Sequence, residues 1–328
     1  MMHPLVSVII PVFNGDRFIA DAIESVLRQT YPHVELIVID DGSSDRSGQI
    51  VQSYGDRLRY IWQLNQGVAA ARNQGLKAAQ GDLIAFLDQD DCYHPEKLEA
   101  QVNCLETQPQ LGWVNSGWQI ADEHGHVLSA VQPWLGIPTL DQAAWIVWKP
   151  VFLGAMLFRR EWFDRVDGFR EQFRYVPDVD LALRLAIAGC QADWVRQSTV
   201  IYRQHERNAS RHVNQQVNEL DIVLSDFFSR SDLPSQVQAL EHQSRYQSLV
   251  WSAWRLYDSD NFTATADALR QSLKYANGAS TAIIHHWVQQ FKRYCAEYGS
   301  TFNSYQLSQS DPWQHLIHEI IAGTIQRY

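Results

Sequence analysis

The sequence of 328 residues is poor in cysteine, and the four it has are not arranged for a structural role. Cys92, Cys104, Cys190 and Cys295 are scattered, with no C-x-x-C pair and no pair of histidines at zinc-finger spacing. Neither a disulfide framework nor a zinc site fits such spacing. We therefore expect free thiols in a reducing compartment.

Long apolar runs and a secretory leader are also missing. No stretch reaches the roughly 18 apolar residues that a membrane-spanning helix requires. The first residues, Met1-Met2-His3-Pro4, run straight into a strand-like segment, without the basic and apolar regions of a signal peptide. We expect no integral membrane segment and a cytoplasmic protein, which could still attach peripherally to a membrane.

Positive charge is in short supply. The chain has 27 Lys and Arg against 37 Asp and Glu, which gives a formal net charge of -10. Nucleic-acid binders need clustered basic side chains for phosphate contacts, so we expect no nucleic-acid partner. A nucleotide ligand remains compatible with this charge, because a metal and backbone amides can meet its phosphates. The 45% of hydrophobic residues indicates a folded protein with a substantial core.

The sequence has no glycine-rich phosphate loop. A dinucleotide-binding fold carries G-x-G-x-x-G after its first strand, and here that place reads Pro11-Val12-Phe13-Asn14-Gly15. No Walker motif occurs in the sequence either. These absences disfavour a nicotinamide-dependent oxidoreductase and a P-loop enzyme. They also weaken a third alternative, a sugar nucleotidyltransferase, whose first loop would normally be rich in glycine, Arg and Lys.

The sequence does contain a regular alternation of apolar strands and helical segments in its first hundred residues. We expect strands at residues 6–12, 36–39, 58–62 and 83–87, with helices between them. Continuous apolar strands separated by helices predict an α/β fold, with a Rossmann-like, mostly parallel sheet flanked by helices. Ligands bind such sheets at the carboxyl ends of the strands, where the acidic clusters 40–41 and 88–91 fall.

The rest of the sequence divides into an irregular part and a helical part. Strands are expected near residues 113–120, 126–131, 152–159 and 199–203, with helices near 139–148 and 178–189. Helical periodicity dominates from about residue 213, most clearly at 236–254, 263–275, 280–298 and 312–326. We therefore predict a catalytic domain over 1–210 and a C-terminal helical region over 211–328. The helical region could bind an acceptor, form a homodimer or lie next to a membrane.

Asp88, Asp90 and Asp91 place three carboxylates within four residues, directly after an apolar strand. Like charges about 4 Å apart repel by a few kcal/mol near a protein surface, so such a cluster usually needs a cation or raised pKa values. Mg²⁺ and Mn²⁺ take oxygen ligands and often complete their shell with substrate phosphates. The alternative is a solvated acidic turn before the helix that begins near Pro95.

Taken together, four segments resemble family 2 glycosyltransferases of the GT-A fold. They are VSVIIPVFN at 6–14, IDDGSSD at 39–45, NQG followed by ARNQG within 65–75, and FLDQDD at 86–91. The resemblance covers roughly residues 5–210. It implies inverting transfer of a sugar from a nucleoside-diphosphate sugar, a UDP-sugar before others, with Mn²⁺ or Mg²⁺. The acceptor would be a glycan, a lipid-linked glycan or a small molecule.

The resemblance also implies roles for residues around the nucleotide. Pro11, Phe13 and Asp41 match positions that surround the nucleobase, with Asp41 as its hydrogen-bonding partner. Asp90 and Asp91 match the end of the D-x-D-D segment, where one carboxylate contacts ribose and the other the metal. Which of the two binds the metal stays open.

Three more residues are expected near the donor on the same grounds. Asp88 belongs to the same acidic segment and is grouped with the donor-binding residues. Arg72 stands where a cation could approach the diphosphate, although an ordinary salt bridge on a helix surface would explain it as well. His205 matches a histidine that follows the last core strand in related enzymes and lies near the metal or the diphosphate. Its alternative is a surface histidine in a polar loop.

The resemblance implies a catalytic base in the segment that starts at Pro177. Asp178 matches the position of the base that takes the proton of the acceptor hydroxyl, and Asp180 is a second candidate. Either aspartate could instead stabilise the first turn of a helix. Pro177 departs from the pattern, since Glu is usual there. This departure motivates a further hypothesis, a degenerate domain that binds a nucleotide-sugar or a partner without turnover.

Overall fold

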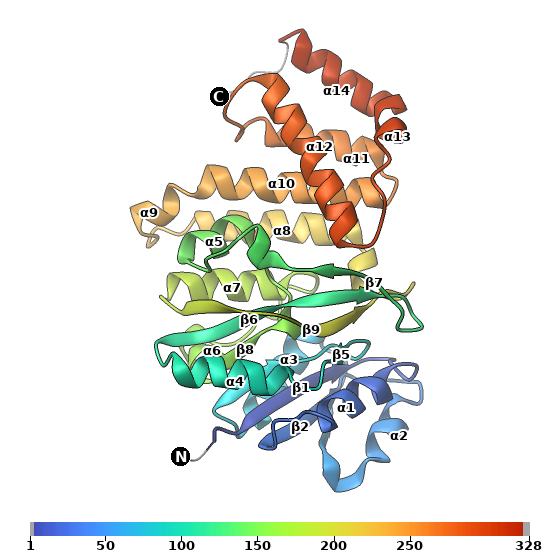
Figure 1. Ribbon diagram of the computed structural model, residues 1–328, viewed down its shortest axis with the longest axis vertical. Helices are drawn as coiled ribbons and strands as arrows, with labels where there is room; N and C mark the ends of the chain where they lie inside the picture. Colours follow the sequence, from blue (N-terminus) through green and yellow to red (C-terminus); the bar gives the residue numbers. More distant parts are fainter. Residues whose placement is uncertain (1–2, 324–328) are drawn as a thin grey trace. The chain divides into compact units, whose positions relative to one another are not determined.

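The computed structural model describes residues 3–323, and the chain divides into two compact units (Figure 1). The first unit contains the chain up to Trp145 together with Pro150–Glu206. The second contains Ile146–Lys149 and the residues from Arg207 onward. The boundary after Glu206 lies close to residue 210, where we placed it from the sequence. The assignment of Ile146–Lys149 to the second unit had no signal in the sequence pattern.

The first unit is built on a sheet whose N-terminal half is parallel. Its central strand is fully buried, because all seven residues of β1 are covered on both faces. The parallel strands, in spatial order, are β3 (Arg59–Trp62), β2 (Val34–Asp40), β1 (Val6–Val12) and β4 (Leu83–Phe86). The helices that connect them are α1 (Ile19–Leu27), α2 (Ser47–Gln52) and α3 (Val68–Ala78).

The other half of the sheet is mixed. β8 (Leu157–Arg159) runs antiparallel between β4 and β6 (Leu111–Ala121), and β9 (Gln191–Arg203) lies parallel to β6. The remaining strands are β5 (Cys92–Tyr93), antiparallel to β9, and β7 (Val127–Val131), antiparallel to β6. The complete order is β3-β2-β1-β4-β8-β6-β9-β5, with β7 beside β6. The predicted α/β fold class is confirmed.

The later helices of this unit flank the sheet and close its core (Figure 1). They are α4 (Lys97–Thr107), α5 (Gln142–Trp148), whose last residues are counted with the second unit, α6 (Glu161–Val166) and α7 (Pro177–Ile187). Trp113, Trp145 and Phe158 are fully buried against one another. Trp113 and Trp145 therefore serve core packing. The strand expected over 152–159 is limited to β8, because a 3₁₀ turn at Leu153–Ala155 precedes it.

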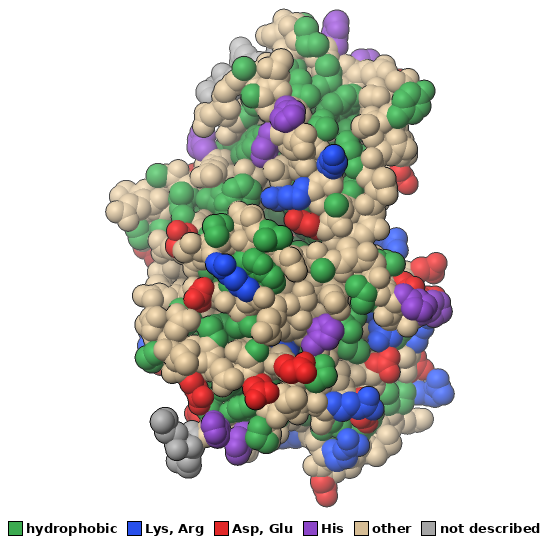
Figure 2. Space-filling view, viewed as in Figure 1, with side chains coloured by type: hydrophobic (Ala, Val, Ile, Leu, Met, Phe, Trp, Pro, Cys, Tyr) green, Lys and Arg blue, Asp and Glu red, His purple; other side chains and the backbone are tan. Residues whose placement is uncertain are grey.

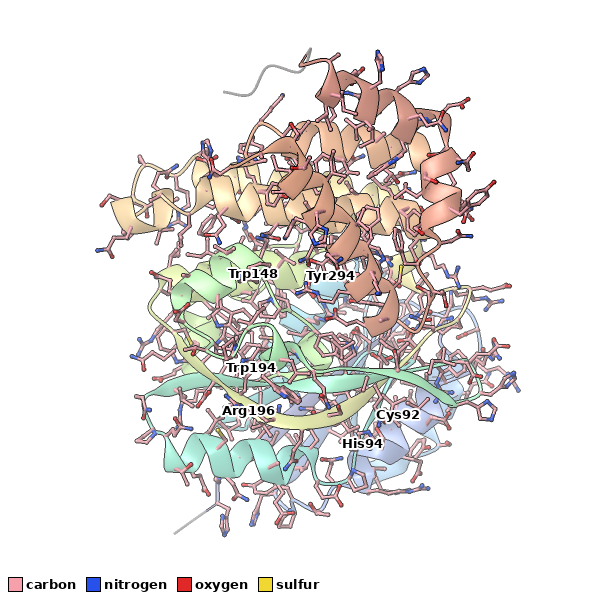
Figure 3. The ribbon with its side chains drawn as sticks, turned by 45° about the horizontal axis from the view of Figure 1, so that its top comes forward. Cys92, His94, Trp148, Trp194, Arg196 and Tyr294 are labelled. Carbon is pink, nitrogen blue, oxygen red and sulfur yellow. The ribbon has the colours of Figure 1, made fainter. Side chains whose placement is uncertain are left out.

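β9 is longer than the sequence pattern indicated, and its side chains hold a neighbouring connection. Figure 3 labels Trp194 and Arg196 on this strand. The indole Nε1 of Trp194 donates to the carbonyl of Ile137 at 2.7 Å, and Arg196 donates to that of Pro138 at 3.3 Å. The long strand therefore fixes the segment between β7 and α5.

On the face shown in Figure 2, acidic and basic side chains are interspersed.

The second unit is helical. Its elements are α8 (Val213–Phe228), α9 (Ser235–Gln238), α10 (Glu241–Asp258), α11 (Phe262–Ser272), α12 (Ser280–Glu297), α13 (Ser304–Gln309) and α14 (Asp311–Ile321). Trp254, Trp287 and Phe291 are fully buried in its core. The prediction missed α8 and α13, and its last helix reached residues 324–326, which lie outside the described residues. Within residues 3–323, no helix combines the length and the apolar character needed to cross a bilayer.

Candidate active site

The loops that follow β1, β2 and β4 meet at one edge of the sheet, because these strands are parallel neighbours. The backbone N–H of Asn14 donates to Ser43 Oγ at 3.0 Å, and that of Gly15 donates to Ser47 Oγ at 2.9 Å. The N–H of Phe13 donates to Gln89 Oε1 at 2.8 Å. The first loop is thus tied both to the segment after β2 and to the acidic segment after β4.

The first loop leaves one aromatic ring exposed. Phe13 is 46% exposed, whereas Pro11 is buried within β1 opposite Ile39. At Gly15 a Cβ would lie 2.4 Å from Gln89 Oε1, so a larger residue there would displace the Gln89 side chain. Phe13 is therefore available to pack against a flat ligand. Pro11 shapes the strand that leads to it.

Asp41 organises the loop that leads into α3. The residue is 3% exposed, and its Oδ1 accepts from Gln63 Nε2 at 2.7 Å and from the N–H of Gln66 at 2.9 Å. Its Oδ2 accepts from the N–H of Gly67 at 2.8 Å. Both oxygens thus have protein partners. Asp41 shapes the wall of the site, and its predicted hydrogen bond to a nucleobase stays a prediction.

Arg72 on α3 forms a salt bridge, but a buried one. Its Nη2 lies 2.7 Å from Asp88 Oδ1, and its side chain is only 7% exposed. The guanidinium also faces the ring of Phe169 at 5.6 Å. Its Nε has no hydrogen-bond partner among the residues that the structure describes. A buried guanidinium with donor capacity to spare is suited to an anionic ligand.

The three aspartates of the acidic segment have different environments. The Asp88 carboxylate is 39% exposed and that of Asp90 is 16% exposed, whereas Asp91 is buried. Asp90 Oδ2 lies 2.9 Å from His205 Nε2. Asp91 turns toward the end of β9, where its Oδ1 accepts from the N–H of Arg203 at 3.0 Å. The structure brings Asp90 and His205 together and directs Asp91 away from them.

The burial of Asp91 favours its neutral form. Burial raises the pKa of Asp91 well above its usual range, and the charges of Asp90 and Asp88 act in the same direction. Its Oδ2 has no partner within the described part of the chain. Through its bond to the N–H of Arg203, Asp91 links the acidic segment to β9.

The donor groups of Asp90 and His205 fit a divalent ion as part of its coordination shell. Over residues 3–323, no group of three or more His, Cys, Asp or Glu side chains is arranged to hold a metal by itself. Asp90 offers a carboxylate oxygen and His205 an imidazole nitrogen on adjacent elements of one site. Mg²⁺ and Mn²⁺ commonly use one or two protein ligands and fill the remaining positions with phosphate oxygens and water. The pair fits such an ion only together with a ligand.

His205 packs against the ring of Phe18, which is itself flanked by the guanidinium of Arg203. The sequence pattern did not indicate these contacts. The ring of Phe18 lies 4.9 Å from the imidazole. The guanidinium of Arg203 lies 4.6 Å from the centre of the same Phe18 ring, and its Nη2 is 3.0 Å from Asp21 Oδ2 on α1. The N-terminus of α1 thus positions the histidine through Phe18.

Asp178 lies in the first turn of α7, within range of the charges of the Arg72–Asp88 pair. Burial raises the pKa of Asp178 to about 6; the charge of Arg72 opposes this shift and that of Asp88 adds to it. The Oδ1 atom accepts from the N–H of Val179 at 3.0 Å. Pro177 occupies the first position of the helix, where its missing N–H costs nothing. The proline therefore starts the helix without displacing Asp178.

Asp180 is an anchor for a loop. Its Oδ1 accepts from Arg170 Nε at 2.8 Å, and its Oδ2 accepts from Arg184 Nε at 2.8 Å. Arg184 also donates to the carbonyls of Val166 and Gly168. Both oxygens of Asp180 are thus held by arginines, which excludes the role of base that we considered for it.

Asn73, which our sequence reasoning had not singled out, fixes the loop in front of α7. Its Nδ2 donates to the carbonyl of Phe169 at 2.8 Å, and its Oδ1 accepts from the N–H of the same residue at 2.9 Å. A Cβ on Gly168 would lie 2.7 Å from Asn73 Oδ1. The signal was the ARNQG segment, in which we had assigned a role to Arg72 alone.

A family model described as glycosyl transferase family 2 matches residues 7–166. The match takes in the loops after β1, β2 and β4 and the whole of α3. Asp178 and His205 lie beyond it.

A curated protein of Rickettsia typhi, named as an uncharacterized glycosyltransferase, is 32% identical over 232 residues. The match covers 69% of this chain and 72% of that protein. Other curated relatives are longer, and the matched part is 38% of one and 46% of another. The chain therefore corresponds to less than half of those two relatives.

Two solved structures have the same fold. One is S. aureus TarS, residues 1–349, in complex with UDP-GlcNAc, with a TM-score of 0.64 at 16% identity over 99% of this chain and 93% of that one. The other is the mannosyltransferase PcManGT of Pyrobaculum calidifontis in complex with GDP-Man and Mn²⁺, with a TM-score of 0.63 at 18% identity over 98% and 88% of the two chains. The fold is that of GT-A enzymes, and with the sequence relationship it shows that the chain belongs to family 2 of the glycosyltransferases, enzymes that transfer sugars.

Proposed function

We propose that this glycosyltransferase moves a sugar from a nucleoside-diphosphate sugar to an acceptor hydroxyl with inversion, with the help of Mn²⁺ or Mg²⁺. The observation that carries the proposal is the position of Asp178 in the first turn of α7, close enough to Arg72 and Asp88 for their charges to act on it. Asp88 belongs to the same segment as Asp90. A base and a cationic group for the diphosphate would then belong to one site. The acceptor is a glycan, a lipid-linked glycan or a small molecule.

The diphosphate would lie between Arg72 and the Asp90–His205 pair. Asp90 and His205 would hold the divalent ion, whose chemistry when bound is to neutralise charge on the departing diphosphate. Arg72 contributes a fixed positive charge beside Asp88. Asp91 is buried and accepts a hydrogen bond from the backbone N–H of Arg203. Because this bond ties the acidic segment to the end of β9, Asp91 would position Asp90 and His205.

Asp178 would take the proton from the acceptor hydroxyl as that oxygen attacks the sugar. A base works best when its pKa lies near the working pH, and burial raises the pKa of Asp178 to about 6. The carboxylate is then ionised at neutral pH and remains more basic than an exposed aspartate. Inversion needs this base on the face of the sugar opposite the diphosphate.

The nucleobase would pack against Phe13, the exposed ring of the first loop. Asp41 supports this pocket by fixing residues 63–67. The two structural relatives hold UDP-GlcNAc and GDP-Man, so both nucleotides belong in a donor screen. UDP-sugars are the first donors to test.

The decisive experiment compares turnover and donor binding in purified protein. Transfer and donor hydrolysis are measured with Mn²⁺ for the wild type, Asp90→Ala and Asp178→Asn. Donor binding is measured by calorimetry on the same proteins. We expect Asp178→Asn to bind the donor and lose turnover, and Asp90→Ala to lose metal-dependent binding. Unchanged turnover in both variants would contradict the assignment. Metal-dependent binding without transfer in the wild type, over a broad acceptor set, would favour the degenerate binding domain instead.

A further inference from the structure

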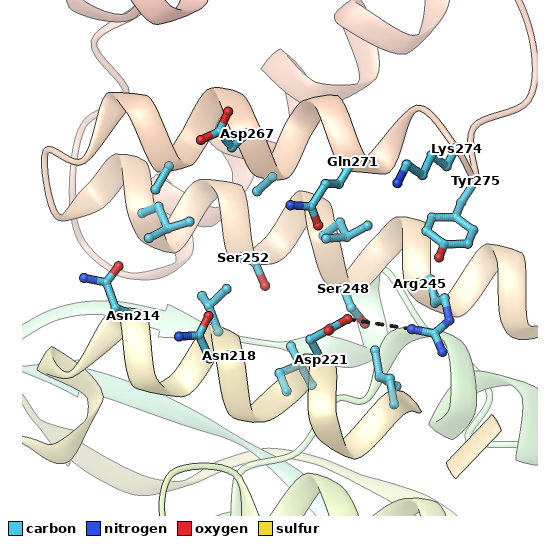
Figure 4. Close-up of a pocket in the computed structure, with 17 residues that line it drawn as sticks. Asn214, Asn218, Asp221, Arg245, Ser248, Ser252, Asp267, Gln271, Lys274 and Tyr275 are labelled. Carbon is cyan, nitrogen blue, oxygen red and sulfur yellow. Dashed lines mark ion pairs between the residues drawn. The ribbon is translucent and has the colours of Figure 1, made fainter. Parts of the chain in front are cut away.

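The helical unit contains a groove between α8, α10 and α11 (Figure 4). Its volume is about 410 Å³, within the range of sites for small ligands. The floor is apolar and comprises Val217, Leu220, Leu224, Leu249, Leu256 and Ala268. The groove lies wholly within the second unit and shares no residue with the site described above.

Amide and hydroxyl groups line the groove above this floor. Asn214 and Asn218 come from α8, Ser252 from α10 and Gln271 from α11, with Tyr275 just beyond its end. Within the described part of the chain, the polar side-chain atoms of these five residues have no hydrogen-bond partner in the protein. Three helices thus place donors and acceptors around one groove, and those of Asn214, Asn218 and Gln271 are exposed to solvent.

Ser252 is the most informative of the five. The residue is only 3% exposed, and its hydroxyl faces the groove (Figure 4). In helices, a buried serine hydroxyl commonly donates to the carbonyl four residues earlier, as Ser248 does here to Ser244 at 2.8 Å. Ser252 makes no such bond in the described structure. The Ser252 hydroxyl is therefore open to the groove, where water or a ligand can bond to it.

The charges at the groove are largely compensated. Arg245 lies 2.8 Å from Glu241 and 3.7 Å from Asp221, and Asp267 lies 2.6 Å from Arg270. Lys274 is the exception, since among the described residues its ammonium group has no ion pair. The groove therefore does not offer the cationic cluster that a diphosphate requires.

We propose that the groove binds a carbohydrate chain. Planar amides match the paired hydroxyls of a sugar ring, and the Tyr275 ring offers an apolar surface for the C–H face of a sugar. Lys274 beside it would accept an anionic substituent. This site goes beyond the proposed catalytic function and does not depend on it, because none of its residues belongs to the donor site or to the base.

The test is saturation-transfer NMR on the full chain with four trisaccharides: cellotriose, maltotriose, chitotriose and trigalacturonate. The variant carries Asn218→Ala and Gln271→Ala. The matched control carries Gln215→Ala and Gln289→Ala, which remove exposed amides of the same unit that do not line the groove. Far-UV circular dichroism and melting temperature establish that both variants fold.

We expect at least one trisaccharide to bind, and the groove variant to bind it about tenfold more weakly, as the loss of two hydrogen bonds predicts. The control should bind like the wild type. Asp178→Asn should also bind the sugar normally, which separates this site from catalysis. Absence of binding by all four sugars, or equal loss in variant and control, would overturn the proposal. A change of oligomeric state in the groove variant, without sugar binding by the wild type, would identify an interface between copies instead.

Discussion

His205 Nε2 lies 2.9 Å from Asp90 Oδ2, although 115 positions separate the two residues in the chain. One residue follows the last strand of the sheet and the other follows β4. The contact closes the site across the two halves of the sheet. Both side chains are mostly buried, at 8% exposure for His205 and 16% for Asp90.

His205→Ala should weaken Mn²⁺-dependent binding of UDP by at least about tenfold, because the ion would lose its imidazole ligand. Calorimetric titration of UDP with Mn²⁺, and with EDTA in its place, measures this effect. His126→Ala, which changes an exposed histidine in the turn before β7, is the control. Equal affinities of His205→Ala and wild type for UDP with Mn²⁺ would remove His205 from the site.

The pH profile of transfer should reflect the ionisation of Asp178. The pKa of this carboxyl is raised to about 6, and a base is active only when ionised. Activity should therefore be complete above about pH 7 and fall roughly tenfold per unit below pH 6. Initial rates at saturating donor, between pH 5 and pH 8, measure it. The residual activity of Asp178→Asn should be flat below pH 6, and the same fall in that variant would assign the ionisation to another group.

Asn73→Ala should lower turnover while donor affinity stays near that of the wild type. The substitution removes both hydrogen bonds to Phe169, so the loop before α7 would no longer hold Asp178 in place. The loss of two hydrogen bonds also predicts a decrease of about 2 kcal/mol in the free energy of unfolding. Steady-state kinetics and urea unfolding test both parts. Gln74→Ala, on the adjacent position of α3, should change neither.

Lys97→Met should stabilise the protein at neutral pH. Lys97 is fully buried, its Nζ donates to Gln101 Oε1 at 2.6 Å, and burial lowers its pKa from 10.5 to about 7. Between pH 7 and pH 10.5 the unfolded chain binds a proton that the folded protein does not. The free energy of unfolding therefore rises with pH in this window, by at most about 1.4 kcal/mol per unit.

Urea unfolding at pH 7, 8 and 9 checks the prediction for Lys97. The difference in unfolding free energy between the variant and the wild type should be largest at pH 7 and shrink as the pH rises. The comparison isolates Lys97 because Lys149, whose pKa burial also lowers to about 7, is present in both proteins. A difference that stays constant with pH would show that Lys97 is charged in the folded protein.

The sequence predicted the parallel half of the sheet well, because the strands there have an unambiguous apolar pattern. β1, β2 and β4 are continuous apolar runs because helices cover both faces of a parallel sheet. The prediction missed the start of β9, because the first residues of this strand are mostly polar and partly exposed. Helix α8 was missed because its apolar stripe is diluted by Asn, Gln and Asp on the exposed face.

The candidate site also has a part that the sequence predicted and a part that it could not predict. The sequence pattern placed the acidic segment at the correct edge, since a strand's end is a local property. The orientation of each aspartate depends on distant partners, such as Arg203 for Asp91. The Asn73 contact with Phe169 joins residues 96 positions apart, and no local pattern records it.

The close approach of α3 to β1 has a mechanical consequence. A Cβ on Gly75 would lie 2.3 Å from Ile9 Cγ2, so only a glycine lets the helix pack this closely on the strand. Within one turn of that contact, Arg72 reaches the acidic segment and Asn73 reaches the loop before the base. The position of the helix therefore sets the distance between the acidic segment and the loop before α7. A larger residue at position 75 would disturb the contacts of Arg72 and of Asn73 at the same time.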